Sequence, residues 1–417
     1  MLEPQSTALF LLFMAAFIGL IWWMAVARQV AFRVLAACLA FVPAMLFGVA
    51  AVNKYYDYYE TWGAVIDDFT NQAANQSPPL HTIPDLTSQK FSKILGGLVN
   101  DAAARQQGYT VQLTIDGKLS HLRRTVYVYL PPQYFQKAYA HYRFPAIELY
   151  TGFPGEPQDW INVLGVTTTL DTLIGDGLAK PTVLVMPDTN GDRRHMLECL
   201  NLPNGPRDGT YLAQDVPDFV SQTIRVQPPG KAWGAAGYSE GGFCAANLAL
   251  QYRRAFGYAG VLSGYFSPLD ILIGEPPRYV QPFAGDAALR AANTPMDELP
   301  LLPSWAAIPQ FWLGAGSGDI QDVSAARAFQ QLLLPRQPKV RVVLYPGGGH
   351  TMLTWRALVT PMLEWMTPQL TAQAHKYRAA PAGHHAHAHV PSACPTCLEG
   401  HGAVGPSLSP PDRPSSG

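Results

Sequence analysis

Charged side chains are scarce in this chain of 417 residues. Lys, Arg, Asp and Glu together make up 14 % of it, and the formal net charge is −1 at pH 7. The sequence contains no basic run and no pattern in which aromatic residues alternate with arginine. Nothing in it therefore indicates a nucleic-acid partner, because proteins that bind nucleic acids carry such basic patches.

Charge is missing altogether from two stretches near the N-terminus. Residues 7–27 form one uncharged run, and residues 34–52 form a second run that contains Pro43. Each run is long enough to cross the hydrocarbon core of a bilayer as a helix, and membrane helices tolerate proline. We therefore predict a transmembrane hairpin over residues 1–53.

The residues before the first run also lack Lys and Arg, which argues against a cleaved signal peptide. That alternative rests on Ala25–Ala27, which has the small-x-small form of a cleavage site. Arg28 and Arg33 lie between the two runs, and basic residues stay on the cytoplasmic side of a membrane. Both ends of the hairpin, and everything after Asn53, are therefore expected outside the cytoplasm.

The rest of the chain divides into regions by composition. Residues 54–108 are polar and predict an extracytoplasmic tether with one short helix around 90–104. Residues 109–370 contain short apolar runs that end in Gly, Asp or Ser and alternate with helical segments, which is typical of a mostly parallel α/β sheet covered on both faces. Within this domain, residues 265–305 are proline-bearing and aperiodic, so we predict a lid there. Residues 371–417 are rich in Ala, Pro, His and Gly and predict disorder.

One serine in the predicted domain lies between two glycines. Gly237 and Gly241 flank Ser239 in GYSEG, a spacing that fits a tight strand-to-helix turn with an exposed hydroxyl. A helix N-cap is the alternative interpretation. A serine nucleophile needs a base that a third group holds in place, and His350, on a glycine loop after the run VRVVLYP, is the best-placed histidine.

Two aspartates compete for the third position. Asp319 ends the run PQFWLGAGSGD, and Asp322 follows three residues later. An aspartate after a strand also commonly caps a helix. We prefer Asp319 over Asp322, so the chain order becomes Ser239, Asp319, His350, which is the order of a serine hydrolase with an α/β-hydrolase fold.

Several segments resemble the esterase D and antigen 85 group of serine esterases and acyltransferases: PPQYF, FPAIELYTGFPGEPQDWIN, GYSEGGFCAANLAL, GYAGVLSGYF and YPGGGHTMLTW. The resemblance covers about Tyr109 to Thr367. It implies an α/β-hydrolase fold and acyl-transfer chemistry on carboxylic esters. It also implies that the backbone N–H groups of Phe153 and Glu240 form the oxyanion hole. Thr151 departs from the pattern, because many family esterases have His at that position.

Cysteines and histidines give two further expectations. Cys199 and Cys244 are the only cysteines in the predicted catalytic domain; they are either buried free thiols or, outside the cytoplasm, a disulfide. Cys394 and Cys397 lie among five histidines of the tail. A structural zinc site needs a fold that holds its ligands, so we predict no metal site and no cofactor.

These observations predict a membrane-anchored, extracytoplasmic serine esterase that acts on carboxylic esters. Its substrate would be an ester, possible sources being a lipid or an acylated sugar of the cell envelope. Acyl transfer to an envelope sugar, as in the antigen 85 branch, is the alternative within the enzyme class. A non-catalytic hydrolase-like binding protein is the alternative outside it, and that interpretation predicts a missing triad member.

Overall fold

The computed structural model describes residues 3, 4, 6–56, 62, 65, 80–82, 102–191, 196–269 and 282–379. The chain divides into two compact units, Met1–Tyr377 and Arg378–Gly417, and nearly all described residues belong to the first. Three sequence expectations lie partly or wholly outside the described residues. These are most of the tether, the middle of the expected lid, and the tail with its cysteines and histidines.

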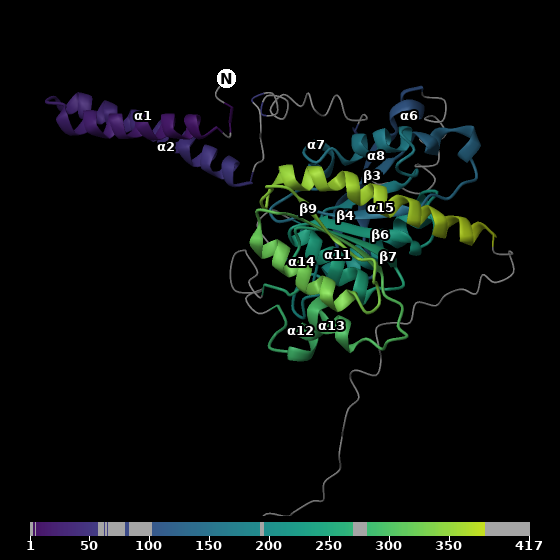
Figure 1. Ribbon diagram of the computed structural model, residues 1–417. Coiled ribbons are helices and arrows are strands. Elements are labelled where there is room, and N and C mark those ends of the chain that lie inside the picture. The colour runs from purple at the N-terminus through teal and green to yellow at the C-terminus, as the bar shows by residue number, and fades with distance from the viewer. Residues whose placement is uncertain are drawn as a thin grey trace, which may run out of the picture. The chain divides into compact units, whose positions relative to one another are not determined.

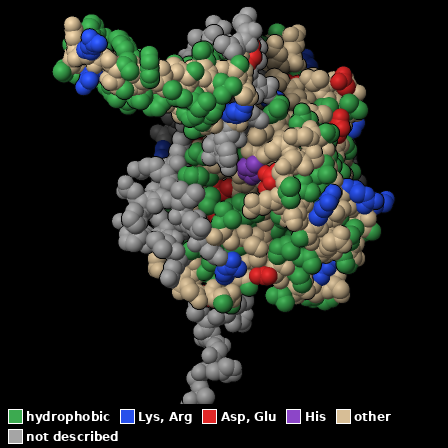
Figure 2. Space-filling view, turned by 60° about the vertical axis from the view of Figure 1, so that its left-hand side comes forward, with side chains coloured by type: hydrophobic (Ala, Val, Ile, Leu, Met, Phe, Trp, Pro, Cys, Tyr) green, Lys and Arg blue, Asp and Glu red, His purple; other side chains and the backbone are tan. Residues whose placement is uncertain are grey.

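The two uncharged runs form two long helices, α1 (Thr7–Val26) and α2 (Val30–Tyr56). They pack against each other, with the rings of Phe10 and Phe47 4.1 Å apart, and hydrophobic side chains cover most of the visible hairpin surface (Figure 2). Both helices are long and apolar enough to cross a membrane, although a signal sequence near an N-terminus passes the same test. The second helix begins four residues before the predicted span, because Val30–Arg33 already has helical backbone.

The described residues after the hairpin build one nine-stranded sheet in the order β1-β2-β3-β5-β4-β6-β7-β8-β9. Strand β3 runs antiparallel to β2 and β5, and all pairs from β5 through β4 to β9 are parallel. The strands are β1 (Leu80–Thr82), β2 (Tyr109–Asp116), β3 (Arg123–Leu130), β4 (Ala146–Tyr150), β5 (Val183–Pro187), β6 (Gly230–Tyr238), β7 (Phe256–Leu262), β8 (Gln310–Gly316) and β9 (Val342–Tyr345). The mostly parallel α/β sheet predicted from the sequence is confirmed.

Helices cover both faces of this sheet (Figure 1). One layer contains α7 (Asp159–Asn162), α8 (Val166–Gly175) and α15 (Met352–Ala379), and the other contains α10 (Val216–Thr223), α11 (Glu240–Gln251) and α14 (Ile320–Leu333). The remaining short helical segments are α6 (Ala102–Gln107), η1 (Pro132–Phe135), η2 (Lys137–Tyr139), α9 (Asp208–Thr210), η3 (Tyr211–Asp215), α12 (Ala287–Ala292) and α13 (Pro295–Leu301).

Continuous apolar strands explain the two-layered core. Strand β5 reads VLVMP, and all five of its residues are buried. Because side chains alternate along a strand, Val183 and Val185 pack into the core on one face and Leu184 and Met186 into the core on the other. A strand that is apolar on both faces buries all its side chains only inside a sheet that is covered by helices on both faces.

Two segments differ from the sequence expectations. Helix α15 continues to Ala379, so residues 371–379 are helical rather than disordered. Burial explains the difference, since Leu370 and Ala374 are 0 % and 1 % exposed and tertiary packing outweighs a composition that disfavours order. The expected lid, residues 265–305, contains the short helices α12 and α13. Of the expected tether helix around 90–104, only the residues from 102 on are described, and they form the start of α6.

Candidate active site

Ser239 occupies the single-residue turn between β6 and α11. Its backbone angles, φ 56° and ψ −122°, are strained for a residue with a side chain. The glycines on either side allow this turn. A Cβ on Gly237 would lie 2.1 Å from the carbonyl oxygen of Gly241, and a Cβ on Gly241 would lie 2.2 Å from that of Tyr150. Ser239 stands at the N-cap position of α11, but its side chain makes no capping hydrogen bond to the helix.

His350 reaches this turn from the loop that follows β9. The Ser239 hydroxyl lies 2.9 Å from His350 Nε2. The imidazole packs edge-on against the buried indole of Trp355, at a centroid distance of 5.0 Å and an angle of 88°. Trp355 in turn stacks on Tyr238, the last residue of β6. The ring is thus held from behind while 38 % of the side chain stays exposed, and Figure 2 shows a histidine side chain lying against acidic side chains on the surface.

Asp322, rather than Asp319, holds the other side of the imidazole. His350 Nδ1 lies 2.7 Å from Asp322 Oδ2 and 3.5 Å from Asp319 Oδ2. The geometry therefore favours Asp322 as the partner of His350, whereas the sequence favoured Asp319. The reason is that Asp319 is the N-cap of α14, where it accepts a hydrogen bond from the backbone N–H of Asp322 at 3.0 Å.

The two carboxylates control the charge of the imidazole. Burial alone would lower the pKa of His350, but its hydrogen bond to Asp322 and the negative charges of Asp322 and Asp319 raise it above the usual 6.5. Burial raises the pKa of Asp322, and His350 opposes that rise. When Nδ1–H donates to Asp322, the neutral ring leaves Nε2 free to accept the Ser239 proton. This arrangement suits a general base.

The loop after β4 approaches the serine closely at Gly152. A Cβ on Gly152 would lie 2.8 Å from Ser239 Cβ, so only glycine fits there. Phe153 follows Gly152 in the chain and Glu240 follows Ser239, so each residue expected to donate an N–H group to an oxyanion comes directly after one side of this close approach. Thr151, which departs from the family pattern, ties this loop to the end of β5 through hydrogen bonds from its N–H and hydroxyl to Thr189 Oγ1, each 3.1 Å long.

Comparison with known proteins decides the family. The family model named Esterase, described as "Putative esterase", matches residues 120–390, which is more than half of the chain. The chain belongs to this esterase family. It is an α/β hydrolase of the esterase D and antigen 85 type, as the sequence motifs predicted.

Two individual proteins are similar to this chain in sequence. A Corynebacterium glutamicum protein described as uncharacterized is 26 % identical over 348 residues, which cover 80 % of this chain and 76 % of that protein. The MPT51 antigen of Mycobacterium leprae is 39 % identical over 59 residues, 14 % of this chain and 19 % of the antigen.

Solved structures show the same fold at low sequence identity. A ferulic acid esterase matches 63 % of this chain and 99 % of its own, with a TM-score of 0.52 and 18 % identity. The fluorophosphonate-binding serine hydrolase F of Staphylococcus aureus matches 62 % of this chain and 98 % of its own, with a TM-score of 0.51 and 17 % identity.

The side chain of Glu240 lies in a buried network that the sequence did not indicate. Its Oε2 accepts a hydrogen bond from Asn190 Nδ2 at 2.9 Å, and its Oε1 accepts one from the backbone N–H of Glu198 at 2.8 Å. Burial raises the pKa of Glu240 to about 8. The one available signal was an acidic residue at the start of an otherwise apolar segment, GGFCAANLAL.

Cys199 and Cys244 form a disulfide in this esterase-family protein, with their Cα atoms 5.6 Å apart. The bond links the segment between β5 and α9 to α11, the helix that begins behind Ser239. The structure thus pairs the two cysteines that the sequence left as either free thiols or a disulfide. Cys38 on α2 is free and exposed.

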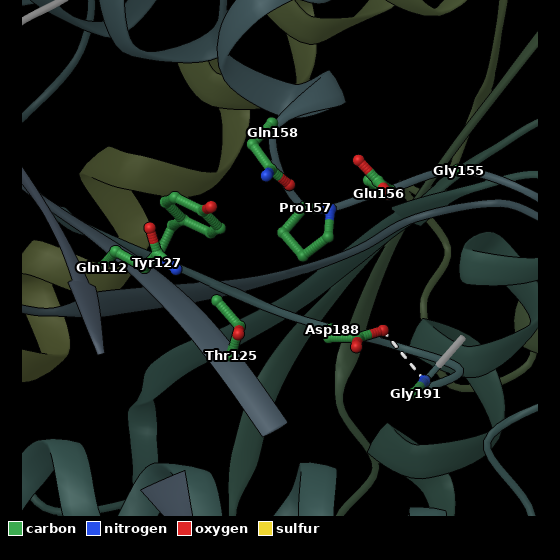
Figure 3. A pocket seen from close by; sticks show the side chains of 9 residues that line it. All are labelled: Gln112, Thr125, Tyr127, Gly155, Glu156, Pro157, Gln158, Asp188 and Gly191. Carbon is green, nitrogen blue, oxygen red and sulfur yellow. Dashed lines mark hydrogen bonds between the residues drawn. The ribbon is translucent and has the colours of Figure 1, made fainter. Parts of the chain in front are cut away.

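A polar cavity of about 410 Å³ adjoins the loop after β4 (Figure 3). Residues 155–158 of that loop form one wall, which includes the Glu156 carboxyl and the Gln158 amide, and the Asp188 carboxyl and the Gln112 amide contribute to the rest. Asp188 also accepts a hydrogen bond from the Gly191 N–H at 2.9 Å. The full lining is Gln112, Thr125, Tyr127, Gly155, Glu156, Pro157, Gln158, Asp188 and Gly191, with no Lys or Arg among them.

Asp319, Asp322 and His350 also bring three potential metal ligands within 4.8 Å of one another. The hydrogen bond between His350 Nδ1 and Asp322 already uses two of the atoms that a metal would need. His350 Nδ1 and Asp322 Oδ2 are therefore already paired with each other by a hydrogen bond. That the protein binds no metal remains a prediction.

Proposed function

We propose that this esterase-family protein hydrolyses carboxylic esters, with Ser239 as nucleophile, His350 as general base and Asp322 as the acid that orients it. One observation carries the proposal. Two linked hydrogen bonds, 2.9 Å from Ser239 to His350 and 2.7 Å from His350 to Asp322, meet at a strained strand-to-helix turn. Such a relay activates an otherwise weak serine nucleophile.

The reaction follows from these positions. Ser239 Oγ attacks the ester carbonyl carbon while His350 Nε2 takes the hydroxyl proton, and the N–H groups of Phe153 and Glu240 hold the oxyanion that forms. His350 then gives the proton to the leaving alcohol, which departs and leaves an acyl-Ser239 ester. Water attacks this ester with His350 again as base, releasing the acid and restoring the serine. Asp322 stabilises the imidazolium without taking its proton.

A panel of p-nitrophenyl esters with acyl chains of graded length tests the proposal. The purified protein should hydrolyse at least one member with saturation kinetics, and the Ser239→Ala variant should not exceed the background rate. The panel also gives the preferred acyl length. A wild-type protein with no more turnover than Ser239→Ala on every ester would favour a non-catalytic binding protein instead.

Acyl transfer to a hydroxylated acceptor is a second candidate, supported by the polar cavity beside the loop after β4. Its amide, hydroxyl and carboxyl groups suit a neutral polyol. In this case an acceptor hydroxyl would replace water as the group that attacks acyl-Ser239. Adding a methyl glycoside to the ester assay distinguishes the two, because transfer produces an acyl-glycoside at the expense of free acid.

We further propose that α1 and α2 anchor the enzyme in a membrane with the catalytic domain outside the cytoplasm. Support comes from the two apolar helices and from Arg28 and Arg33 at the connection between them. A reporter that is active only after export, fused after Asn53, should be active. An inactive export reporter together with an active cytoplasmic one would reject this orientation.

A further inference from the structure

Glu240 directly follows the proposed nucleophile Ser239, and its side chain is bonded within the protein. Its backbone N–H is a proposed oxyanion donor, while its side chain is buried, the residue being 1 % exposed. Each carboxyl oxygen accepts one N–H bond, from Asn190 Nδ2 and from the backbone of Glu198. Both donors lie in the segment between β5 and α9.

That segment is itself held in place from two directions. Glu198 and Cys199 adopt positive φ angles of 50° and 54°, which non-glycine residues adopt only when their surroundings enforce it. The Glu198 carboxyl accepts hydrogen bonds from the Tyr265 hydroxyl at 2.8 Å and the Leu269 N–H at 2.9 Å. Cys199 is joined to Cys244, which lies four residues after Glu240 and so on the same side of α11.

A buried carboxyl at this position has a cost that an apolar side chain would avoid. Removing a carboxyl group from water is unfavourable, and burial raises the pKa of Glu240 to about 8. What the carboxyl provides, and an apolar side chain cannot, is two directional hydrogen bonds, one with Asn190 and one with Glu198. Oxyanion donors need to lie about 2.7 to 3.1 Å from the position that the oxyanion will occupy.

We propose that the Glu240 carboxyl is a positioning residue that fixes the first turn of α11, and with it the Glu240 N–H that holds the oxyanion. This inference rests on the proposed function of Ser239. The bonds from Asn190 and Glu198 anchor the side chain, and the disulfide one turn further along holds the same face of the helix. A tilt of this turn would move the N–H and leave the substrate pocket largely as it is.

A pair of substitutions tests the role through hydrogen-bond direction. In Glu240→Gln the new amide N–H₂ faces the Asn190 Nδ2 donor, so one bond is lost. Asn190 cannot simply turn over, because its Oδ1 accepts the Leu197 N–H at 3.0 Å. Adding Asn190→Asp places a carboxyl oxygen opposite the new amide of Gln at position 240, so that the amide donates and the hydrogen bond is restored in the reverse direction. The other carboxyl oxygen still accepts the Leu197 N–H, and the pair regains the wild-type formal charge.

The expected readout is a loss in kcat that the second substitution reverses. We expect Glu240→Gln to lower kcat by about 10- to 100-fold, less than the loss of a whole oxyanion donor, and to change KM by less than about threefold. The double variant should recover kcat to within about threefold of wild type. Titration of the active serine with a fluorophosphonate counts folded sites, so that kcat refers to folded enzyme only.

Asp171→Asn is the matched control. Asp171 on α8 is also a partly buried carboxyl with a hydrogen bond, 2.5 Å from the Tyr129 hydroxyl. Tyr129, however, pairs with Leu184 near the start of β5, and Ser239 follows the opposite, C-terminal ends of the parallel strands. This variant should lower the melting temperature and keep the wild-type kcat. An equal kcat loss in Asp171→Asn would overturn the proposal, because the effect would then be one of general stability.

Two further results would also overturn it: wild-type kcat in Glu240→Gln, or a kcat loss that Asn190→Asp does not reverse. If Glu240→Gln does not fold, Asn190→Ser removes one of the two donors and leaves Glu240 in place, and unchanged kcat there rejects the inference. Ser239→Ala separates this test from the proposed function. Ester turnover that survives Ser239→Ala rejects both the Ser239 mechanism and the positioning role of Glu240. If only the Glu240 variants give the contradicting results, the Ser239 mechanism is unaffected.

Discussion

Two aspartates lie beside a single imidazole nitrogen of His350, and they have different tasks. Asp322 makes the short hydrogen bond to Nδ1, and Asp319 caps α14 while adding a second negative charge 3.5 Å away. The first fixes the orientation and tautomer of the ring. The second acts on His350 mainly through charge.

Replacing each aspartate by asparagine separates these tasks. Asp322→Asn should lower kcat/KM by about 10³- to 10⁴-fold, as expected when a triad loses the acid that sets the tautomer. Asp319→Asn should lower kcat/KM by less than about tenfold. It should also shift the acid limb of the pH profile to lower pH, because the pKa of His350 falls when one of the carboxylates that raise it is removed and the neutral ring is the active form. Steady-state kinetics from pH 5 to 9 measure both effects. A larger loss in Asp319→Asn than in Asp322→Asn would restore Asp319 as the orienting acid.

Ser239 and His350 could be proposed from the sequence because each has a local signature, the paired glycines around the serine and the glycine loop before the histidine. The sequence favoured Asp319, whereas Asp322 lies closer to His350 Nδ1, and the two aspartates are only one helical turn apart. Only the start of α14 decides which of them faces the ring. The side-chain partners of Glu240 lie about 40 to 50 positions away along the chain, and no local pattern encodes such contacts.

At the scale of elements, the turn between β6 and α11 depends on close backbone approach. Gly241→Ala would place its Cβ 2.2 Å from the carbonyl oxygen of Tyr150 on β4, so strand or helix must shift. We expect a stability loss of about 3 kcal/mol or more and loss of ester turnover, measured by urea unfolding and by the p-nitrophenyl ester assay.

The control is Gly175→Ala at the end of α8, where an added Cβ meets nothing within 4 Å. Alanine is the better helix former by about 1 kcal/mol, so this variant should be as stable as wild type or slightly more stable. Equal stability of the two variants would show that the turn tolerates a side chain and that the close approach at Gly241 is not required.

The disulfide joins two elements that are 45 residues apart in the chain. Closing a loop of this length stabilises a protein by about 4 kcal/mol in the chain-entropy estimate. Cys199→Ala combined with Cys244→Ala should therefore lower the free energy of unfolding by about 2 to 4 kcal/mol, and dithiothreitol should destabilise the wild type but not this variant. Two alkylatable thiols at these positions in protein purified from its native location would contradict the bond.

Element positions followed from the sequence where the apolar pattern was continuous. Strand β5, with every residue buried, matches the run KPTVLVMPD, and β8 matches PQFWLGAGSGD. The end of α15 was missed because its last turns read as polar and alanine-rich. They are held by Leu370 and Ala374 against the rest of the fold, and burial of this kind depends on the tertiary structure.

At the scale of the whole molecule, several carboxyl groups are buried at a cost that depends on pH. Burial raises the pKa of Glu240 to about 8 and those of Asp208 and Asp171 to about 7, with Arg124 opposing the rise at Asp208. Each folded pKa exceeds the unfolded value, so the stabilisation is complete below about pH 4 and is lost as the pH rises through 7 to 8. The raised pKa of His350 acts in the same direction.

The free energy of unfolding should therefore decrease between pH 5 and pH 8 at constant ionic strength. Urea titrations of the soluble domain at each pH measure this slope. Asp171→Asn should flatten it, because one of the contributing groups no longer titrates. A free energy of unfolding that increases over this range would mean that these carboxyls are ionised in the folded protein.

The general architecture, an apolar hairpin followed by an α/β hydrolase, could be predicted from the sequence because both parts have strong compositional patterns. Charge-free runs mark the first, and apolar strands with Gly, Asp or Ser at their ends mark the second. The acyl and alcohol parts of the substrate left no such pattern. They depend on the shape of the surface around Ser239, which segments distant in sequence build together.

The central claim is that Ser239, activated by His350, forms the acyl-enzyme. Rapid mixing with a reactive ester, acid quenching and peptide mass spectrometry test it most directly, applied to the wild type, Ser239→Ala, His350→Ala and the double variant. The wild type should carry an acyl group on the peptide that contains Ser239, and Ser239→Ala should carry none. Each single variant should lose turnover by a similar factor, on the order of 10⁶, and the double variant little more, because the residues act as a unit. An acyl adduct or substantial turnover in Ser239→Ala would contradict the account.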